Sequence, residues 1–244
     1  MLTLAHPPIV EAVLDIECDM PPGLDLATLQ QPSREALKAE YPQFRKQVVQ
    51  VHKVENEWTP KITLTEALDG LHFRTGDEKQ LVQVRRTGFS FNRLNPYTTL
   101  DDYLPEIKRT WSIFVEIARP VLVRQLRLRY INKIVIPINT TFDLKEYFKI
   151  GPRLPDDKTM DIASFLNQCT VEERDTGNFV NIVLTSQPFE NEGAPFILDI
   201  TALRTEKIQV EDWTLLADRI GLLRGTKNRV FEKSLTDKCL TLFQ

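Results

Sequence analysis

The stretch HPPIVEAVLDIECDMP, residues 6 to 21, alternates between two kinds of side chain. Small or apolar residues occupy every second position from Val10 to Cys18, and the positions between and after them include Glu11, Asp15, Glu17 and Asp19. A period of two predicts a strand that buries one side and presents a row of carboxylates on the other. Such a row needs a counterpart, which is a metal ion, a basic ligand or another part of the same chain.

The composition is that of an ordinary globular domain. Of 244 residues, 42% are hydrophobic and 27% are charged, with a net charge of −3. This balance argues against a surface built mainly to coat nucleic acid, so a nucleic-acid partner is not favoured. No apolar run reaches the roughly 20 residues of a membrane span, and the N-terminus lacks a signal-peptide pattern. Three widely spaced cysteines suit a reducing compartment, and we predict a cytoplasmic protein without membrane contact.

The expected elements come in the same order twice. The first series is a strand at about 8–18, a helical segment from Asp25, several strands between about 44 and 94, and a long helix from Thr99 to before Pro120. In the strand block, ITLTEA and LHFRT are expected as two short strands around Asp69-Gly70. The second series is a strand at 121–137, a helix start at Asp143 and strands at about 162–174, 178–186 and 194–208. Helical material closes the chain, with one apolar face of Trp213, Leu216, Ile220 and Leu223 and, after Gly225, another of Phe231, Leu235 and Leu242.

We therefore predict an α+β fold of two similar β-α-β-β-β-α units, residues 1–119 and 120–244, forming one compact domain. The units are expected to share one antiparallel sheet with helices on one face. Asp25-Leu26 of the first unit corresponds to Asp143-Leu144 of the second, and Pro21 to Pro137. The element order is similar to that of TATA-binding proteins, which is a topological analogy without functional content.

The first strand of the second unit carries the opposite charge to that of the first. One side holds Leu122, Leu126, Leu128, Tyr130, Ile134 and Ile136, and the other holds Arg127, Arg129 and Lys133. A pseudo-twofold axis would pair these two strands at the sheet centre, where each pair of opposite charges contributes about 0.2–1 kcal/mol. We predict that the acidic row faces the basic row within one molecule.

Two sharper interpretations of the charged rows stay open. Asp15, Glu17 and Asp19 offer hard oxygen ligands for Mg²⁺. Alternatively, the basic side chains bind phosphate groups. These side chains are Arg85, Arg86, Arg93, Arg127, Arg129 and Lys133.

Motifs with a defined chemistry are missing from the sequence. It contains no GxxxxGK[ST] or GxGxxG loop, no GxSxG elbow and no HxxxH or HExxH spacing. We accordingly predict no catalytic residue, metal or cofactor and lean against an enzyme. The most unusual polar cluster is GFSFNRLNPYTT, residues 88–99, where Asn92, Arg93 and Tyr97 either shape a turn or form a binding loop. The candidate ligand- or partner-binding residues are Asn92, Arg93, Tyr97, Arg127, Arg129 and Lys133.

Four landmarks resemble a sporadically distributed, uncharacterised family of prokaryotic proteins. They are PPIVEAVLDIEC, GFSFNRLNPYTT, LRYINKIVIP and NRVFEKSLTDKCLTLF, so the likeness spans nearly the whole chain. The resemblance implies no activity, cofactor or catalytic residue. The patchy occurrence of that family implies an accessory role in mobile or defence-associated loci.

The leading hypothesis is a binding or accessory protein that acts through a protein partner or a homo-oligomer. An unpaired sheet edge or an exposed apolar patch would form its interface. One alternative is an enzyme or sensor for a phosphate-bearing ligand, either a nucleotide or nucleic acid. Another alternative is a purely structural oligomer.

Overall fold

The computed structural model describes residues 4–55, 61–137, 143–153, 162–189 and 193–244. Within them a nine-stranded antiparallel sheet runs in the order β2-β3-β4-β5-β1-β6-β9-β8-β7, so the fold is α+β. The strands are β1 Ile9–Asp19, β2 Gln43–Glu55, β3 Lys61–Arg74, β4 Gln80–Arg85, β5 Gly88–Leu94, β6 Leu122–Ile136, β7 Leu166–Glu172, β8 Phe179–Ser186 and β9 Ala194–Ile208. The helices are α1 Gln30–Leu37, α2 Leu100–Ala118, α3 Trp213–Ser234 and α4 Asp237–Leu240, with short 3₁₀ segments η1 Leu26–Leu29, η2 Leu144–Glu146 and η3 Thr241–Phe243. None of the helices described is long and apolar enough to cross a bilayer.

Strands β1 and β6 lie side by side at the centre of the sheet. They are antiparallel, and the register places Asp15 opposite Arg127 and Val13 opposite Arg129. The prediction that the two oppositely charged strands pair within one molecule is thereby confirmed. On its other edge β1 pairs with β5, and β6 pairs with β9.

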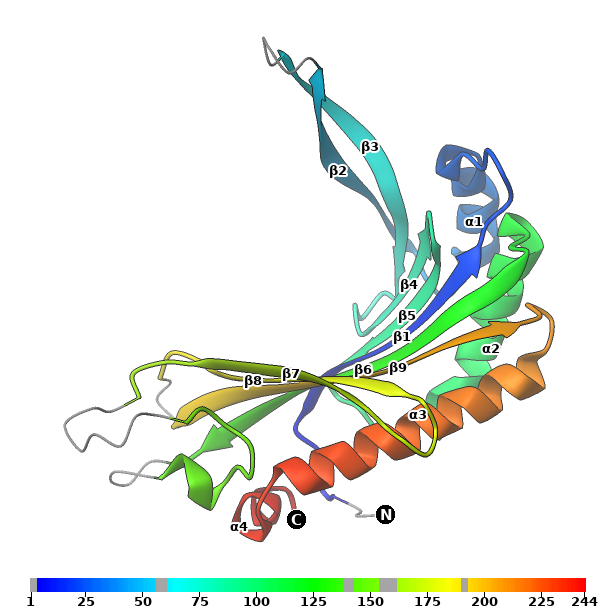
Figure 1. Ribbon diagram of the computed structural model, residues 1–244. Coiled ribbons are helices and arrows are strands. Elements are labelled where there is room, and N and C mark those ends of the chain that lie inside the picture. Colours follow the sequence, from blue (N-terminus) through cyan, green and yellow to red (C-terminus); the bar gives the residue numbers. More distant parts are fainter. Residues whose placement is uncertain (1–3, 56–60, 138–142, 154–161, 190–192) are drawn as a thin grey trace.

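The long helices cover one face of the sheet. Figure 1 shows α1, α2 and α3 on the same, convex side of the curved sheet, while the β2–β3 hairpin rises away from the rest. The buried residues of β1 point toward these helices, as the alternation predicts; they are Ala12, Leu14, Ile16 and Cys18. We call the opposite side of the sheet, which carries Asp15, Arg127 and Arg129, the open face.

Helix α2 begins and ends where the sequence predicts. Thr99 and Asp102 form a reciprocal capping box at its start, and Arg119 adopts a left-handed conformation after its end, just before Pro120. Its buried stripe includes Tyr103, Ile107, Trp111 and Phe114. The Trp111 indole N–H donates to the carbonyl of Val210 at 3.1 Å, which ties α2 to the segment between β9 and α3.

The expected change of apolar face after Gly225 is wrong for Phe231. Helix α3 is continuous because its apolar stripe of Leu216, Ile220 and Leu223 continues to Phe231. Glycine in a helix interior costs only about 1 kcal/mol, which the burial of several such side chains exceeds.

Three details of the strands also differ from expectation. β3 is one strand rather than two, because Asp69 of the turn signal Asp69-Gly70 forms a bulge in β3, opposite the step from Gln47 to Val48 in β2. A second bulge near the start of β6 puts Val123, rather than Leu122, among the fully buried residues. Among the described residues, the first half contains five strands, β1 to β5, and the second half contains four, β6 to β9, so the two series of elements differ in length.

Candidate functional site

The charged rows of β1 and β6 form ion pairs on the open face. Arg127 lies 2.8 Å from Glu17, Arg124 pairs with Asp19, and Arg85 of β4 lies 2.7 Å from Asp15 in a contact without hydrogen-bond geometry. The three carboxylates of the Mg²⁺ hypothesis thus each face an arginine. No group of three His, Cys, Asp or Glu side chains suited to a metal ion occurs in the described ranges.

The three arginines of β6 each pair with a carboxylate. Arg129 makes a bidentate contact with Asp199 of β9, at 2.6 to 3.0 Å, instead of meeting a carboxylate of β1. Lys133 lies on the same side of β6, and its backbone N–H donates to the Pro8 carbonyl at 2.9 Å. Because these pairs offset the charges of the arginines, they weaken the positive field on which phosphate binding at this part of the open face would depend.

The polar cluster around residues 88–99 is divided between the two faces of the sheet. Asn92 lies on the open face, where its amide donates to Glu11 at 2.7 Å and accepts from Gln83. Arg93 points to the helix side and donates to the Pro96 carbonyl at 3.0 and 3.2 Å. These two residues shape the sheet and the turn, whereas Tyr97 reaches a pocket.

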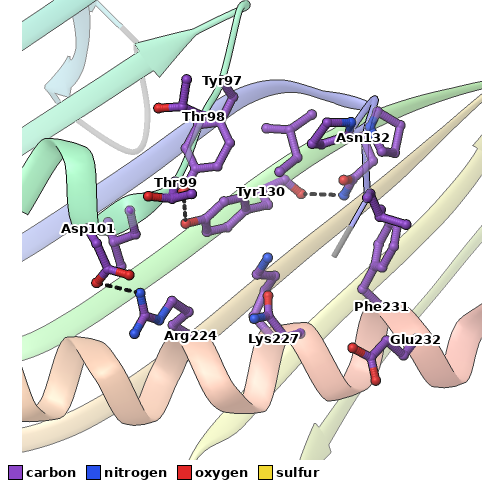
Figure 2. Close-up of a pocket in the computed structure, with 16 residues that line it drawn as sticks. Tyr97, Thr98, Thr99, Asp101, Tyr130, Asn132, Arg224, Lys227, Phe231 and Glu232 are labelled. Carbon is purple, nitrogen blue, oxygen red and sulfur yellow. Dashed lines mark hydrogen bonds and ion pairs between the residues drawn. The ribbon is translucent and has the colours of Figure 1, made fainter. Parts of the chain in front are cut away.

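That pocket is a cavity of about 270 Å³ on the helix side of the β1–β6 seam. Its walls come from the centre of the sheet, the start of α2, one face of α3 and the N-terminal residues 4–9. Figure 2 shows Tyr97 and Tyr130 on one side and Lys227 rising from α3 toward Tyr130. The apolar part of the lining includes Leu4, Pro7, Pro8, Ile9, Leu100 and Phe231.

A pair of phenol groups forms the polar centre of the wall. The hydroxyls of Tyr97 and Tyr130 are 2.6 Å apart, and their rings meet edge to face with centroids 5.4 Å apart. Tyr130 belongs to the buried side of β6, and Tyr97 follows β5 just before α2. Burial raises the pKa of Tyr130 to about 12 and also raises that of Tyr97, so both hydroxyls keep their protons at neutral pH.

Lys227 is the buried cation of the pocket. Only 7% of the residue is exposed, and its ammonium group lies over the Tyr130 ring, 3.7 Å from the centroid. Its Nζ donates no hydrogen bond to any residue that the structure describes. Burial is the main cause that lowers the pKa of Lys227 to about 7; the Arg224 charge adds to this, and Glu232 opposes it.

Arg224 precedes Lys227 by one turn of α3 and lies at the same pocket. Its Nη1 donates to the Asp101 carboxylate in the first turn of α2 at 2.7 Å, as Figure 2 shows. A guanidinium has five N–H donors, and this bond uses one of them. The pocket therefore combines an apolar body, two protonated phenols, a desolvated amine, a guanidinium and the carboxylates of Asp101 and Glu232.

Comparison with known proteins provides no further assignment. A scan against models of protein families finds no match, and a search of curated proteins finds no relative of significant similarity. The resemblance to the sporadically distributed prokaryotic family stays a prediction.

The sequence singled out Tyr97 but missed Lys227, Tyr130 and Arg224. A signal for Lys227 was present, because it lies four residues after Leu223 and four before Phe231, on the apolar stripe of α3. A charged residue at such a position is expected to be buried or paired. The expected change of face after Gly225 hid this periodicity, because it assigned Leu223 and Phe231 to different faces.

Proposed function

We propose that the protein binds a small organic anion in the pocket around Lys227. The observation that carries this proposal is the amine of Lys227, which is buried, aimed into a cavity and without a hydrogen-bond acceptor in the described part of the chain. A buried ammonium without such a partner lowers stability, and an anionic ligand would provide the missing charge and acceptor. A carboxylate or a phosphate on a small apolar body suits this lining.

The size and lining of the cavity support a compact ligand. A volume of about 270 Å³ lies just below the usual range of about 300–1,000 Å³ for ligand pockets. Aromatic and proline side chains provide apolar contact for the body of the ligand. The hydroxyls of Thr98 and Thr99 at the start of α2 add polar groups at the same cavity.

Small aromatic anions are expected to stabilise the protein against heat. Benzoate and phenyl phosphate should raise the melting temperature in a thermal-shift assay at pH 6, and benzyl alcohol should not. Above pH 7 the anion must bind together with a proton on Lys227, so its affinity is expected to fall about tenfold per pH unit. Equal stabilisation by benzyl alcohol, or the same affinity at pH 6 and pH 9, would contradict the proposal.

A second candidate function is the binding of a protein partner at the edge strand β7. This strand ends the sheet order, and it exposes Leu166 at 67% and Val171 at 42%, beside Phe179 of β8 at 40%. An exposed edge with apolar side chains can pair with an extended segment of another protein. This supports the accessory role expected from the sequence.

Val171→Lys is expected to abolish recovery of that partner when the tagged protein is purified from its own cells. Lysine at an edge opposes strand addition without disturbing the core. The matched control is Thr170→Lys, which places the charge on the opposite side of the same strand. A lone monomer in wild-type purifications would contradict partner binding, and a dimer by light scattering would identify a second copy of the chain instead.

We also infer an internal duplication, with an element order similar to that of TATA-binding proteins. It is supported by two short 3₁₀ segments that follow the central strands and are capped by Asp25 and Asp143. In the inferred duplication, the pocket lies where the two halves meet. The proposed location is the cytoplasm, which three free cysteine thiols support.

A further inference from the structure

We propose that Lys227 captures a small oxo acid, a compound with both a carbonyl and a carboxylate, as a reversible imine. This inference rests on the proposed function, because the carboxylate is the anionic group that the pocket would hold. It adds a covalent step and restricts the ligand class to aldehydes or ketones that carry an acid group.

The position of the amine carries the inference. Lys227 Nζ lines the cavity and lies against the face of the Tyr130 ring, at 3.7 Å from its centroid. Amines that form imines are characteristically lysines desolvated in an apolar pocket or placed near another cation. Lys227 meets both conditions, since it is buried and Arg224 lies one helical turn away.

The groups near Lys227 would contact different parts of a bound oxo acid. Residues three apart on a helix face have Cβ atoms about 5–6 Å apart, so Arg224 and Lys227 would reach two ends of one small molecule. Arg224 would hold the carboxylate. The hydroxyl pair of Tyr97 and Tyr130 lies at the same cavity and would donate a hydrogen bond to the carbonyl oxygen as negative charge develops on it.

The chemical step is balanced within the site. The lone pair of the neutral amine attacks the carbonyl carbon, and a proton passes from nitrogen to oxygen to give a carbinolamine. The C–O bond then breaks, and the oxygen leaves with both original amine hydrogens as one water molecule. No oxidant or reductant is consumed, and hydrolysis reverses the step. The lowered pKa of Lys227, near 7, keeps about half of the amine neutral at neutral pH.

The test uses 4-carboxybenzaldehyde and its alcohol, 4-(hydroxymethyl)benzoate, as matched probes. The full-length protein is incubated with each at pH 7 and treated with cyanoborohydride, and its peptides are examined by mass spectrometry. We expect the aldehyde to add one probe mass less one oxygen atom at Lys227. The yield there should be about a hundredfold higher than at the exposed Lys233 of the same helix. The alcohol should leave no adduct.

Two variants and a thermal-shift readout separate the possible outcomes. Lys227→Arg keeps a cation but not a nucleophile and should lose the adduct, whereas Lys233→Arg should keep it. Stabilisation by both probes without an adduct at Lys227 would overturn imine formation and leave anion binding intact. Stabilisation by neither probe would overturn both. Equal labelling of Lys227 and Lys233 would also overturn the inference.

Discussion

Lys227→Met is expected to raise the free energy of unfolding at pH 6 by about 2 kcal/mol and to abolish stabilisation by benzoate. The ordinary pKa of 10.5 falls to about 7 on folding, which corresponds to a ceiling of about 5 kcal/mol for the penalty of burying the charge. The attraction between the ammonium and the Tyr130 ring offsets up to about 2 kcal/mol of it. Methionine fills a similar volume without the charge.

The advantage of the variant should disappear at high pH. Between pH 7 and about 10 the unfolded wild-type chain binds a proton on Lys227 that the folded chain lacks, so wild-type stability rises with pH in this window. The Lys227→Met protein lacks this titrating amine, so its free energy of unfolding should not rise between pH 7 and about 10. Urea unfolding at pH 6 and pH 10 measures both differences, and Lys233→Met is the exposed control. A destabilised Lys227→Met protein at pH 6 would show that the amine contributes to the fold.

Gly88→Ala and Gly193→Ala are each expected to lower the free energy of unfolding by about 3 kcal/mol or more. Their backbone φ angles are +144° and +142°, values that residues other than glycine rarely adopt. A Cβ at Gly88 would lie 2.1 Å from the Ile16 carbonyl oxygen of β1, and one at Gly193 would lie 2.2 Å from the Ile136 carbonyl oxygen of β6. Both clashes involve backbone and have no flexible side chain to move.

The two substitutions also test the inferred duplication. Gly88 is the first residue of β5 and Gly193 immediately precedes β9, the strands that flank β1 and β6 in the sheet. If the two glycines have equivalent structural roles in the two halves, urea unfolding should show similar decreases in the free energy of unfolding for the two variants. Gly221→Ala is the control, because no heavy atom lies within 4 Å of its Cβ position and alanine favours the interior of α3. Normal stability in either variant at Gly88 or Gly193 would contradict the equivalence.

Local patterns predicted the parts of the fold that depend on nearby residues. The alternation in β1 and the Thr99–Asp102 capping box have short-range causes, and both are confirmed. The pairing of β1 with β6 is a long-range contact, and it was predicted from the opposite charges of the two strands. The single long β3 was missed because its bulge at Asp69 depends on pairing with β2, where Gly70 lies opposite Gln47, 23 positions away along the chain. Likewise, the partner of Arg129 lies on β9, and residue order alone does not specify a contact 70 residues away.

The candidate site was less accessible to sequence reasoning because it is assembled from four separate segments. Tyr97 was identified from a polar cluster, but its hydroxyl partner Tyr130 looked like one more core residue of an apolar strand side. Asn92 and Arg93 were grouped with Tyr97 by adjacency, yet they point to opposite faces of the sheet. Lys227 could have been noticed as a charge on the apolar stripe of α3, but only the structure shows that it lies at a cavity.

The most direct test of the proposed anion site is a pH titration of the Lys227 amine by NMR in protein labelled with ¹⁵N-lysine. Lys227→Met identifies the resonance. We predict a pKa near 7 in the free protein and a clear increase when benzoate is present, because the bound anion favours the charged amine. A Lys227 resonance that titrates near 10.5 and does not respond to benzoate would contradict the account.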